Sequence, residues 1–302
     1  MGIRMKKILS IIQLSLIFML CGCAKADELG KNDIITAFYV NHSEFTFFEV
    51  SAEILDFESN NKTRTETAFG ETVEAAYANL MKNMKNVPYA GHAGVLVLGD
   101  GLCLEGLKET ISFFSDINII SPNINLMLTE DSFMVFNPHS IYEASKSEAL
   151  PAVPLYTLFI PENRMTVIPV IKSTDGEPEK AGGIIAENLE FKYYADEKSC
   201  TIYRLLTNNF NDRYFNSNEI LKSKCKIKNN NGTLKIRLEL TLKNLTKKEN
   251  ENISSRISEE IKKFTDELKK HNLCSVLKNG DFNTCTIEIK ITVPDTGKLK
   301  EE

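Results

Sequence analysis

The sequence predicts an α+β or mixed α/β fold with several domains. An N-terminal mixed α/β sheet region is expected to precede a C-terminal curved antiparallel sheet packed on a long helix. Strand-like and helix-like apolar patterns alternate over residues 34–136, which favours a helix-covered sheet. Strand-like alternation dominates after Gly182. One amphipathic segment at 248–271 carries a narrow apolar stripe that must be buried, and the sheet is its nearest partner.

The N-terminal segment is typical of a bacterial secretory signal. Basic residues precede an apolar run of about 13 residues at 8–20, and small residues follow. Residues 20–23 read Leu-Cys-Gly-Cys, the lipobox pattern, in which the chain is cut before the last cysteine and that thiol is alkylated with diacylglycerol. We therefore expect a signal peptide over 1–22, an N-acyl, S-diacylglycerol cysteine at Cys23 and a tether over 23–32. The alternative is a retained transmembrane anchor, but the run is shorter than the ~20 residues that a spanning helix needs.

Residues 33–178 form the predicted N-terminal α/β region. Its strands are rich in β-branched and aromatic residues, and its helices carry apolar residues at helical spacing. The elements in chain order are strands at 34–40 and 45–57, a helix at 70–86, a strand at 95–99, a helix at 104–116, and strands at 125–129 and 133–136. The run 95–99 is apolar and bounded by glycines, which is typical of a fully buried strand.

Residues 137–178 hold six of the nine prolines, so the N-terminal region is either one unit or two subdomains. Short strands are predicted near 155–160 and 164–172. Residues 173–178 read Ser-Thr-Asp-Gly-Glu-Pro, which is typical of a turn or linker. We place the main domain boundary there.

Residues 179–302 form the predicted C-terminal, β-rich domain. Strands are expected at 184–195, 199–206, 223–229, 233–243 and 285–293. Asn231-Gly232 is a strong hairpin signal. The alternation from Leu234 to Leu242 predicts a sheet that is buried on one face and solvated on the other, as in antiparallel sheets. The 248–271 helix should pack on it, and a coiled-coil dimer is the weaker rival because the stripe is short.

Composition argues against several classes of function. The formal net charge is −5 at pH 7, which disfavours nucleic-acid binding and also membrane attachment by charge alone. Of seven cysteines, five remain after processing and lipidation, and no two are spaced Cys-x-x-Cys, so a zinc knuckle or redox pair is not expected. Cys274 and Cys285 could bridge a helix end to the next strand. The other interpretation is that all five are small core residues.

The sequence predicts no catalytic residue, no cofactor and no metal site. We therefore expect that the protein is not an enzyme. The four histidines form no metal motif, and the chain holds no nucleophile elbow, phosphate loop or dinucleotide fingerprint. His92 is the one histidine with a possible function, because it lies in a turn with Gly91 and Gly94 before the buried strand. It is either a proton-responsive or ligand-contacting group or, as we favour, a structural histidine whose ring nitrogens bond the backbone.

The order of several segments carries a family resemblance. The lipobox Gly22-Cys23, the strand Ile34–Ala37, the helix start Gly70–Ala75, the Gly-His segment Tyr89–Gly99 and the run Ala181–Ile185 occur in this order. Together they resemble the Ger(x)C lipoproteins, the C subunits of spore germinant receptors. The chain departs from that family at Ala24-Lys25, where Trp-Asp is usual, and it lacks the tryptophan that the family has near 192–206.

The resemblance implies a lipid-anchored receptor subunit with several mixed α/β domains and no cofactor. Such subunits take part in nutrient-triggered germination with two integral-membrane partners, A and B, at the spore inner membrane, with the body on the outer face. The alternative is a substrate-binding or scaffold lipoprotein of the envelope, which should show a deep cleft between two similar lobes. A third hypothesis is an anchored hydrolase, which a pocket with shifted pKa values would support.

Overall fold

The computed structural model describes most of the chain after residue 31. The described residues are 32–42, 47–56, 63–99, 101–102, 107–116, 120–137, 139–147, 150, 153–159, 165–187, 190–207, 214–215, 218–242, 247–277 and 282–292. The predicted signal peptide, Cys23 and the tether up to residue 31 lie outside them.

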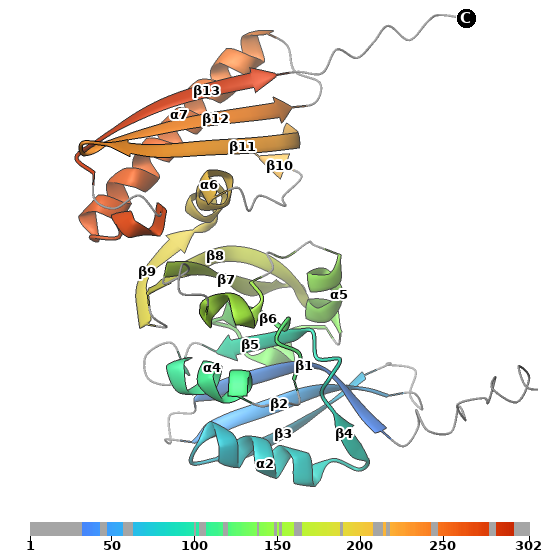
Figure 1. The fold of residues 1–302 in the computed structure, drawn as a ribbon. Helices are drawn as coiled ribbons and strands as arrows, with labels where there is room; N and C mark the ends of the chain where they lie inside the picture. Colours follow the sequence, from blue (N-terminus) through green and yellow to red (C-terminus); the bar gives the residue numbers. More distant parts are fainter. Residues whose placement is uncertain are drawn as a thin grey trace, which may run out of the picture.

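A nine-stranded mixed sheet forms the first layer of the described part (Figure 1). Its order is β3-β2-β1-β5-β6-β7-β8-β9, and β4 pairs with β1. The central strands β1, β5, β6 and β7 run parallel, whereas β2-β3 and β8-β9 add antiparallel pairs at the two sides. The bounds are β1 Asn32–His42, β2 Phe48–Leu55, β3 Thr63–Gly70, β4 Val87–Tyr89, β5 Val95–Gly99, β6 Asn125–Thr129, β7 Met165–Thr174, β8 Glu177–Glu187 and β9 Glu190–Asp196.

Helices cover both faces of the central strands, which explains why those strands read as continuous apolar runs. On one face, α2 (Val73–Asn83) and α4 (Leu107–Asp116) pack with Phe38 of β1 in the largest core cluster. On the other face, Tyr39 packs with the short 3-10 helix η2 (Phe133–Val135) and with α5 (Ser140–Lys146). The predicted N-terminal mixed α/β sheet region is therefore confirmed.

Three predicted strands are short helices in the structure. Phe133 and Phe136 are both buried, and this three-residue spacing suits the 3-10 turn η2 rather than strand alternation. Residues 155–159 form a second 3-10 helix, η3 (Leu155–Phe159). The third is α6 (Glu197–Thr207), predicted as a strand at 199–206. The Asp196 Oδ1 atom accepts a hydrogen bond from the Ser199 N–H at 2.8 Å, which satisfies a free donor in the first turn and favours the helix.

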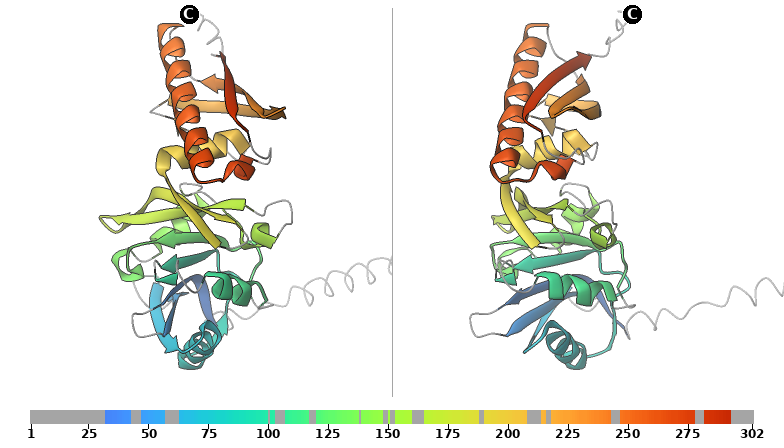
Figure 2. Two further views of the ribbon diagram at one scale, coloured as in Figure 1. Left: turned by 90° about the vertical axis from the view of Figure 1, so that its left-hand side faces the viewer. Right: turned by 60° about the vertical axis from the view of Figure 1, so that its left-hand side comes forward.

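A second sheet has the order β10-β11-β12-β13 and packs on α7 (Lys247–Lys270). Its strands are β10 (Tyr214–Phe215), β11 (Asn218–Asn230), β12 (Thr233–Leu242) and β13 (Thr284–Thr292), and a 3-10 helix, η5 (Cys274–Leu277), follows α7. The predicted stripe of α7 is buried against this sheet in one cluster with Ile202, Leu205 and Leu206 of α6. Figure 2 shows this unit at one end of an elongated molecule and α2 at the other. No helix of the described segments is both long and apolar enough to cross a bilayer.

The second sheet is mixed rather than antiparallel as predicted. β11 and β12 form the predicted hairpin, with Asn231 and Gly232 at positive φ in the turn. β13, however, pairs with β12 in parallel. The reason is that α7 is a crossover connection, which returns the chain to the end of the sheet where β12 began.

Residues 173–178, predicted to mark the domain boundary, form instead the hairpin turn between β7 and β8. Asp175 and Gly176 adopt positive φ, as a tight hairpin requires. Because β8 and β9 belong to the first sheet, the change from one sheet to the other comes after β9, through α6.

The described cysteines are all free thiols, so Cys274 and Cys285 do not pair. Cys200, Cys225 and Cys274 are buried, as small core residues are. Burial raises the pKa of the Cys200 thiol to about 12 and that of Cys225 to about 12. Both are therefore protonated and weakly nucleophilic at neutral pH.

Asp33, at the start of β1, joins β1 to the loop after α2 and to β3. Its carboxylate is 2% exposed and accepts hydrogen bonds from the Asn86 N–H at 3.1 Å and from the Asn86 side-chain amide at 2.9 Å. It also forms an ion pair with the Arg64 guanidinium at 2.8 Å. Burial acts to raise the pKa of Asp33, but the bonds from Asn86 and Arg64 outweigh it and lower the pKa below its ordinary 3.8.

We expect Asp33→Asn to reduce the free energy of unfolding at neutral pH by about 1–3 kcal/mol, because it leaves charged and polar donors poorly paired. A lowered folded-state pKa means that the stabilisation is present above pH 3.8 and is lost as pH falls through the folded pKa. The difference between the two proteins, measured by urea titration from pH 7 downwards, should therefore shrink in acid. Glu66→Gln, at a more exposed partner of Arg64, is the control and should change little. A pH-independent difference for Asp33→Asn would contradict the assignment.

Candidate functional site

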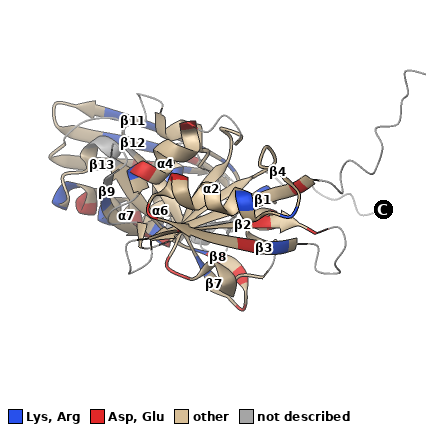
Figure 3. Cartoon of the chain, turned by 90° about the horizontal axis from the view of Figure 1, so that it is seen from below, with Lys and Arg blue, Asp and Glu red and all other residues tan. Residues whose placement is uncertain are grey.

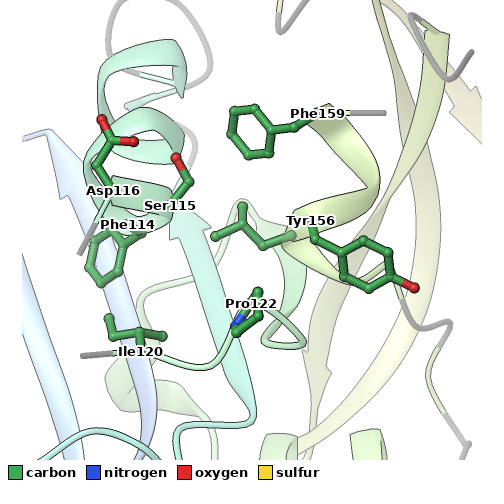
Figure 4. A pocket seen from close by; sticks show the side chains of 8 residues that line it. Phe114, Ser115, Asp116, Ile120, Pro122, Tyr156 and Phe159 are labelled. Carbon is green, nitrogen blue, oxygen red and sulfur yellow. The ribbon is translucent and has the colours of Figure 1, made fainter. Parts of the chain in front are cut away.

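An apolar pocket opens between the end of α4 and η3, and its cavity volume is about 450 Å³. Phe114, Ser115 and Asp116 of α4 line one wall, Ile120 and Pro122 line the floor, and Leu155, Tyr156 and Phe159 of η3 line the other wall. Figure 4 shows the ring of Phe159 reaching from η3 toward α4, whereas the ring of Tyr156 points away from α4 at the edge of the pocket. Large aromatic side chains around a hollow are typical of sites that receive an apolar group.

The walls of the pocket are held by the core and by backbone hydrogen bonds. Phe114 is buried and packs its ring 5.4 Å from that of Phe38, which fixes the end of α4. The Leu155 N–H donates to the Ile124 carbonyl at 2.8 Å, and the Tyr156 N–H donates to the Pro122 carbonyl at 3.2 Å. These bonds set η3 beside β6, so the pocket is built before any partner arrives.

The aromatic rim is exposed although its neighbours are buried. Tyr156 is 45% exposed and Phe159 46%, whereas Leu155 between them and the core is 1% exposed. Exposed aromatic rings grouped around a hollow are characteristic of contact surfaces. The pocket is thus the best candidate in the described residues for a contact with another molecule.

The electrostatics of the pocket rim favour a positively charged neighbour. Asp116 is the last residue of α4, and no basic residue lies in the last turn of that helix. The C-terminal end of a helix carries partial negative charge, which adds to the carboxylate. The Ser115 hydroxyl donates to the Ser112 carbonyl at 2.8 Å. The arrangement can therefore hold an apolar group that carries a cation beside it.

A second polar cluster lies under α5, on the opposite face of the sheet from α4. Glu53 of β2 accepts hydrogen bonds from the Thr36 hydroxyl at 2.5 Å and from the His139 N–H at 2.6 Å, and its Oε1 atom lies 3.0 Å from His139 Nδ1. His139 Nε2 lies 3.1 Å from Glu143. The two carboxylates lie on different nitrogens of one ring, so they do not converge on a common point. The cluster ties the start of α5 to the sheet.

The turn with Gly91, His92 and Gly94 is present as predicted, but its histidine is placed differently. The Ala93 N–H donates to the Ala90 carbonyl at 3.0 Å, which closes the turn. The His92 ring is exposed and packs edge-on against Tyr89, 5.2 Å away, and in the described part of the chain its nitrogens make no hydrogen bond. The predicted bonds from the ring to the backbone are therefore wrong.

Gly94 has a packing role that the sequence did not reveal. Its N–H donates to the Thr36 carbonyl at 2.9 Å, and its carbonyl accepts from the Asn125 N–H at 2.9 Å. A Cβ atom at this position would lie 2.8 Å from Tyr142 Cε2 of α5. Glycine therefore lets α5 approach the sheet closely.

The structure does not test the predictions about the lipid anchor and the absence of a metal site. Cys23 lies outside the described residues. Within the described residues, no group of three or more His, Cys, Asp or Glu side chains could hold a metal ion. Sequence reasoning missed the pocket, because Phe114 and Phe159 are far apart in the chain and each reads as an ordinary apolar residue.

Comparison with known proteins gives one family match and one structural match. The family model for the spore germination protein N-terminal domain matches residues 25–171. The crystal structure of the GerBC protein aligns with a TM-score of 0.46 at 14% sequence identity, covering 85% of this chain and 97% of that one. No curated protein matches the chain.

Proposed function

The chain belongs to the Ger(x)C family of spore germination proteins, and from that membership we propose that it is a lipid-anchored C-type subunit of a spore germinant receptor. The observation that carries the proposal is the match over residues 25–171. This range contains β1 to β6, the helices that cover them and the whole candidate pocket. In this role the protein takes part in nutrient-triggered germination through contacts with other proteins.

We propose that the anchor is Cys23, alkylated with diacylglycerol after removal of residues 1–22. The lipobox Leu-Cys-Gly-Cys at 20–23 supports this assignment. A cysteine that carries two or three acyl chains holds a protein on a bilayer without further help. The body would then lie on the outer face of the spore inner membrane.

The proposed partners are two integral-membrane subunits, A and B. The pocket between α4 and η3 supports a contact role, because its exposed aromatic rim suits an apolar side chain of a partner, with a basic group near Asp116. We further propose that the protein works by binding and not by catalysis. The two sheets of the described part differ in size and strand order, unlike the paired lobes of a substrate-binding lipoprotein.

Deletion of the gene tests the function directly. Spores without it should lose the response to at least one single nutrient, and the intact gene should restore it. We expect Tyr156→Ser with Phe159→Ser to restore it poorly, because losing two aromatic anchors costs about 2 kcal/mol or more, roughly 30-fold in affinity for a partner.

The matched control is Phe69→Ser with Met134→Ser, which removes two exposed apolar side chains outside the pocket lining. It should restore germination as the intact gene does. Normal germination of the deleted strain on every nutrient would refute the receptor assignment. Equal restoration by the two double variants would refute the role of the pocket.

A further inference from the structure

The second sheet has one bare face. α7 lies on one side of β11, β12 and β13, and nothing in the described part of the chain covers the other side (Figures 1 and 2). Side chains alternate strictly along β12, so that Leu234, Ile236, Leu238, Leu240 and Leu242 face α7. The residues between them project from the bare face into solvent.

The bare face is strongly basic. Among the side chains that the structure describes on this face, the charged ones are all exposed, and seven are basic and two acidic: Lys222, Lys224, Lys226, Lys228, Lys235, Arg237 and Lys290 against Glu239 and Glu288. Figure 3 shows blue segments along β11 and β12. Of these side chains, Arg237 pairs with Glu288 at 2.8 Å, and no ion pair of the described residues involves the lysines of β11.

This charge is segregated from an acidic remainder. Residues 32–207 hold 25 acidic and 12 basic residues, whereas residues 208–302 hold 14 acidic and 19 basic ones. The formal net charge of −5 therefore hides a basic end. The expectation that charge alone does not attach the chain to a membrane rests on the net charge, which does not describe this uneven distribution.

The register of the sheet places like charges directly opposite each other. Lys228 pairs with Lys235, and Lys226 pairs with Arg237. Elsewhere on the face Glu239 lies opposite Lys224 and Lys290, and Arg237 also lies opposite Glu288. Like charges in such pairs destabilise a sheet. Lysines on an edge strand often block unwanted strand pairing, and this function accounts for lysines on β11. It does not account for the basic residues of β12, because β12 is an inner strand with partners on both sides. An opposing layer of negative charge would relieve the repulsion on both strands.

The composition of the face distinguishes among anionic partners. Protein interfaces are enriched in aromatic residues, Met and Arg and depleted in Lys, and single-stranded nucleic acid is held by aromatic stacking. The bare face carries one arginine and no aromatic residue, and the exposed large apolar residue of these strands is Leu221 beside the bulge at β11. A broad lysine surface suits a plane of anionic headgroups, each lysine adding attraction without fixed geometry.

We propose that the bare face of β11, β12 and β13 rests on the anionic phospholipid headgroups of a membrane. The proposal goes beyond the proposed function, because it requires the unlipidated body to bind a bilayer without Cys23. Such contact would orient an anchored protein by placing the second sheet at the lipid surface.

Vesicle sedimentation of unlipidated chain, residues 24–302, tests the proposal. We expect binding to vesicles that contain phosphatidylglycerol, no binding to phosphatidylcholine alone, and loss of binding as salt rises. Changing Lys224, Lys226, Lys228 and Lys235 together to Gln should lower the partition coefficient by at least roughly tenfold. This variant should fold, because it removes two like-charge pairs and only one opposite-charge pair, Lys224 with Glu239. Its thermal midpoint should equal or exceed that of the parent.

The matched control changes four exposed lysines outside the second sheet to Gln. They are Lys82 of α2, Lys108 of α4, Lys172 of β7 and Lys198 of α6. It alters the net charge equally and should bind as the parent does. Failure of the parent to bind the anionic vesicles, or an equal loss in the control, would overturn the proposal. So would unchanged lipid binding by the β11–β12 variant together with lost binding of an acidic peptide or oligonucleotide. Germination assays on the gene deletion decide the receptor role separately.

Discussion

Cys23→Ala is expected to leave the protein as an uncleaved precursor without diacylglycerol. In the proposed anchor the lipid is joined through the thiol of Cys23, and alanine has no nucleophile to form that thioether. The lipoprotein peptidase cuts after the lipid is attached, so the signal segment should remain. Intact mass and labelling with a radioactive fatty acid measure both outcomes. Spores that carry this variant should germinate on single nutrients as poorly as the deleted strain.

Cys21→Ala is the control for the Cys23 variant. It removes a thiol two positions away, at the variable position of the Leu-x-Gly-Cys pattern. It should be cut and lipidated as the parent is. Normal lipid labelling of Cys23→Ala, or loss of labelling in Cys21→Ala, would place the anchor elsewhere.

Glu53→Ala is expected to reduce the free energy of unfolding by about 3 kcal/mol, because it removes one partner of a buried, charged hydrogen-bond cluster. Glu53 is 5% exposed and accepts bonds from the Thr36 hydroxyl and the His139 N–H. Without it the His139 N–H loses its acceptor, and the Thr36 hydroxyl keeps only the backbone carbonyl of residue 53, at 3.3 Å. His139 is also held at φ 68°, an uncommon conformation for a residue with a side chain, and the bond from its N–H helps to keep it there.

Glu143→Ala is the matched control for Glu53→Ala. Glu143 contacts the other nitrogen of the same ring, His139 Nε2, at 3.1 Å, but its side chain is 66% exposed. A solvent-exposed pair of this kind contributes about 0–1 kcal/mol. Thermal and urea unfolding of the two variants should therefore separate clearly. A loss for Glu53→Ala no larger than that for Glu143→Ala would show that the buried cluster does not hold α5 on the sheet.

Several elements could be predicted because their signals are local. The helix α7 was expected at 248–271 and is found at Lys247–Lys270. Its buried residues Ile257, Ile261 and Phe264 are three or four positions apart, a spacing that puts them on one face of a helix but not of a strand. The hairpin of β11 and β12 followed from Asn231-Gly232, whose positive φ angles are a property of those residues themselves. The buried strand β5 followed from an apolar run between glycines.

One error in the fold prediction came from a local helix cap that the apolar pattern did not reveal, and another from long-range strand pairing. The run 199–206 has the apolar content of a strand, yet Asp196 caps it as the helix α6. Residues 173–178 have the composition of a linker, yet they turn β7 into β8 because the two strands pair over their whole length. Composition cannot distinguish a tight turn within a sheet from a boundary between domains.

The pocket and the basic face could not be predicted from the sequence, because both depend on contacts between residues that are far apart in the chain. The pocket needs α4 and η3 side by side, and this depends on the pairing of β5 with β6 and on the bonds from Leu155 and Tyr156. The lysines of β11 and β12 read as the wet side of two strands until the register sets Lys228 against Lys235.

The sequence by itself determines which segments become helix or hairpin, because torsional preference and apolar periodicity act between residues that are close in the chain. It also carries the lipobox on which the proposed anchor rests. Folding in three dimensions decides which strands become partners, that β13 runs parallel to β12, and which distant side chains meet around Glu53 or in the pocket. These outcomes depend on the free energy of burying whole faces together, which no short stretch of sequence contains.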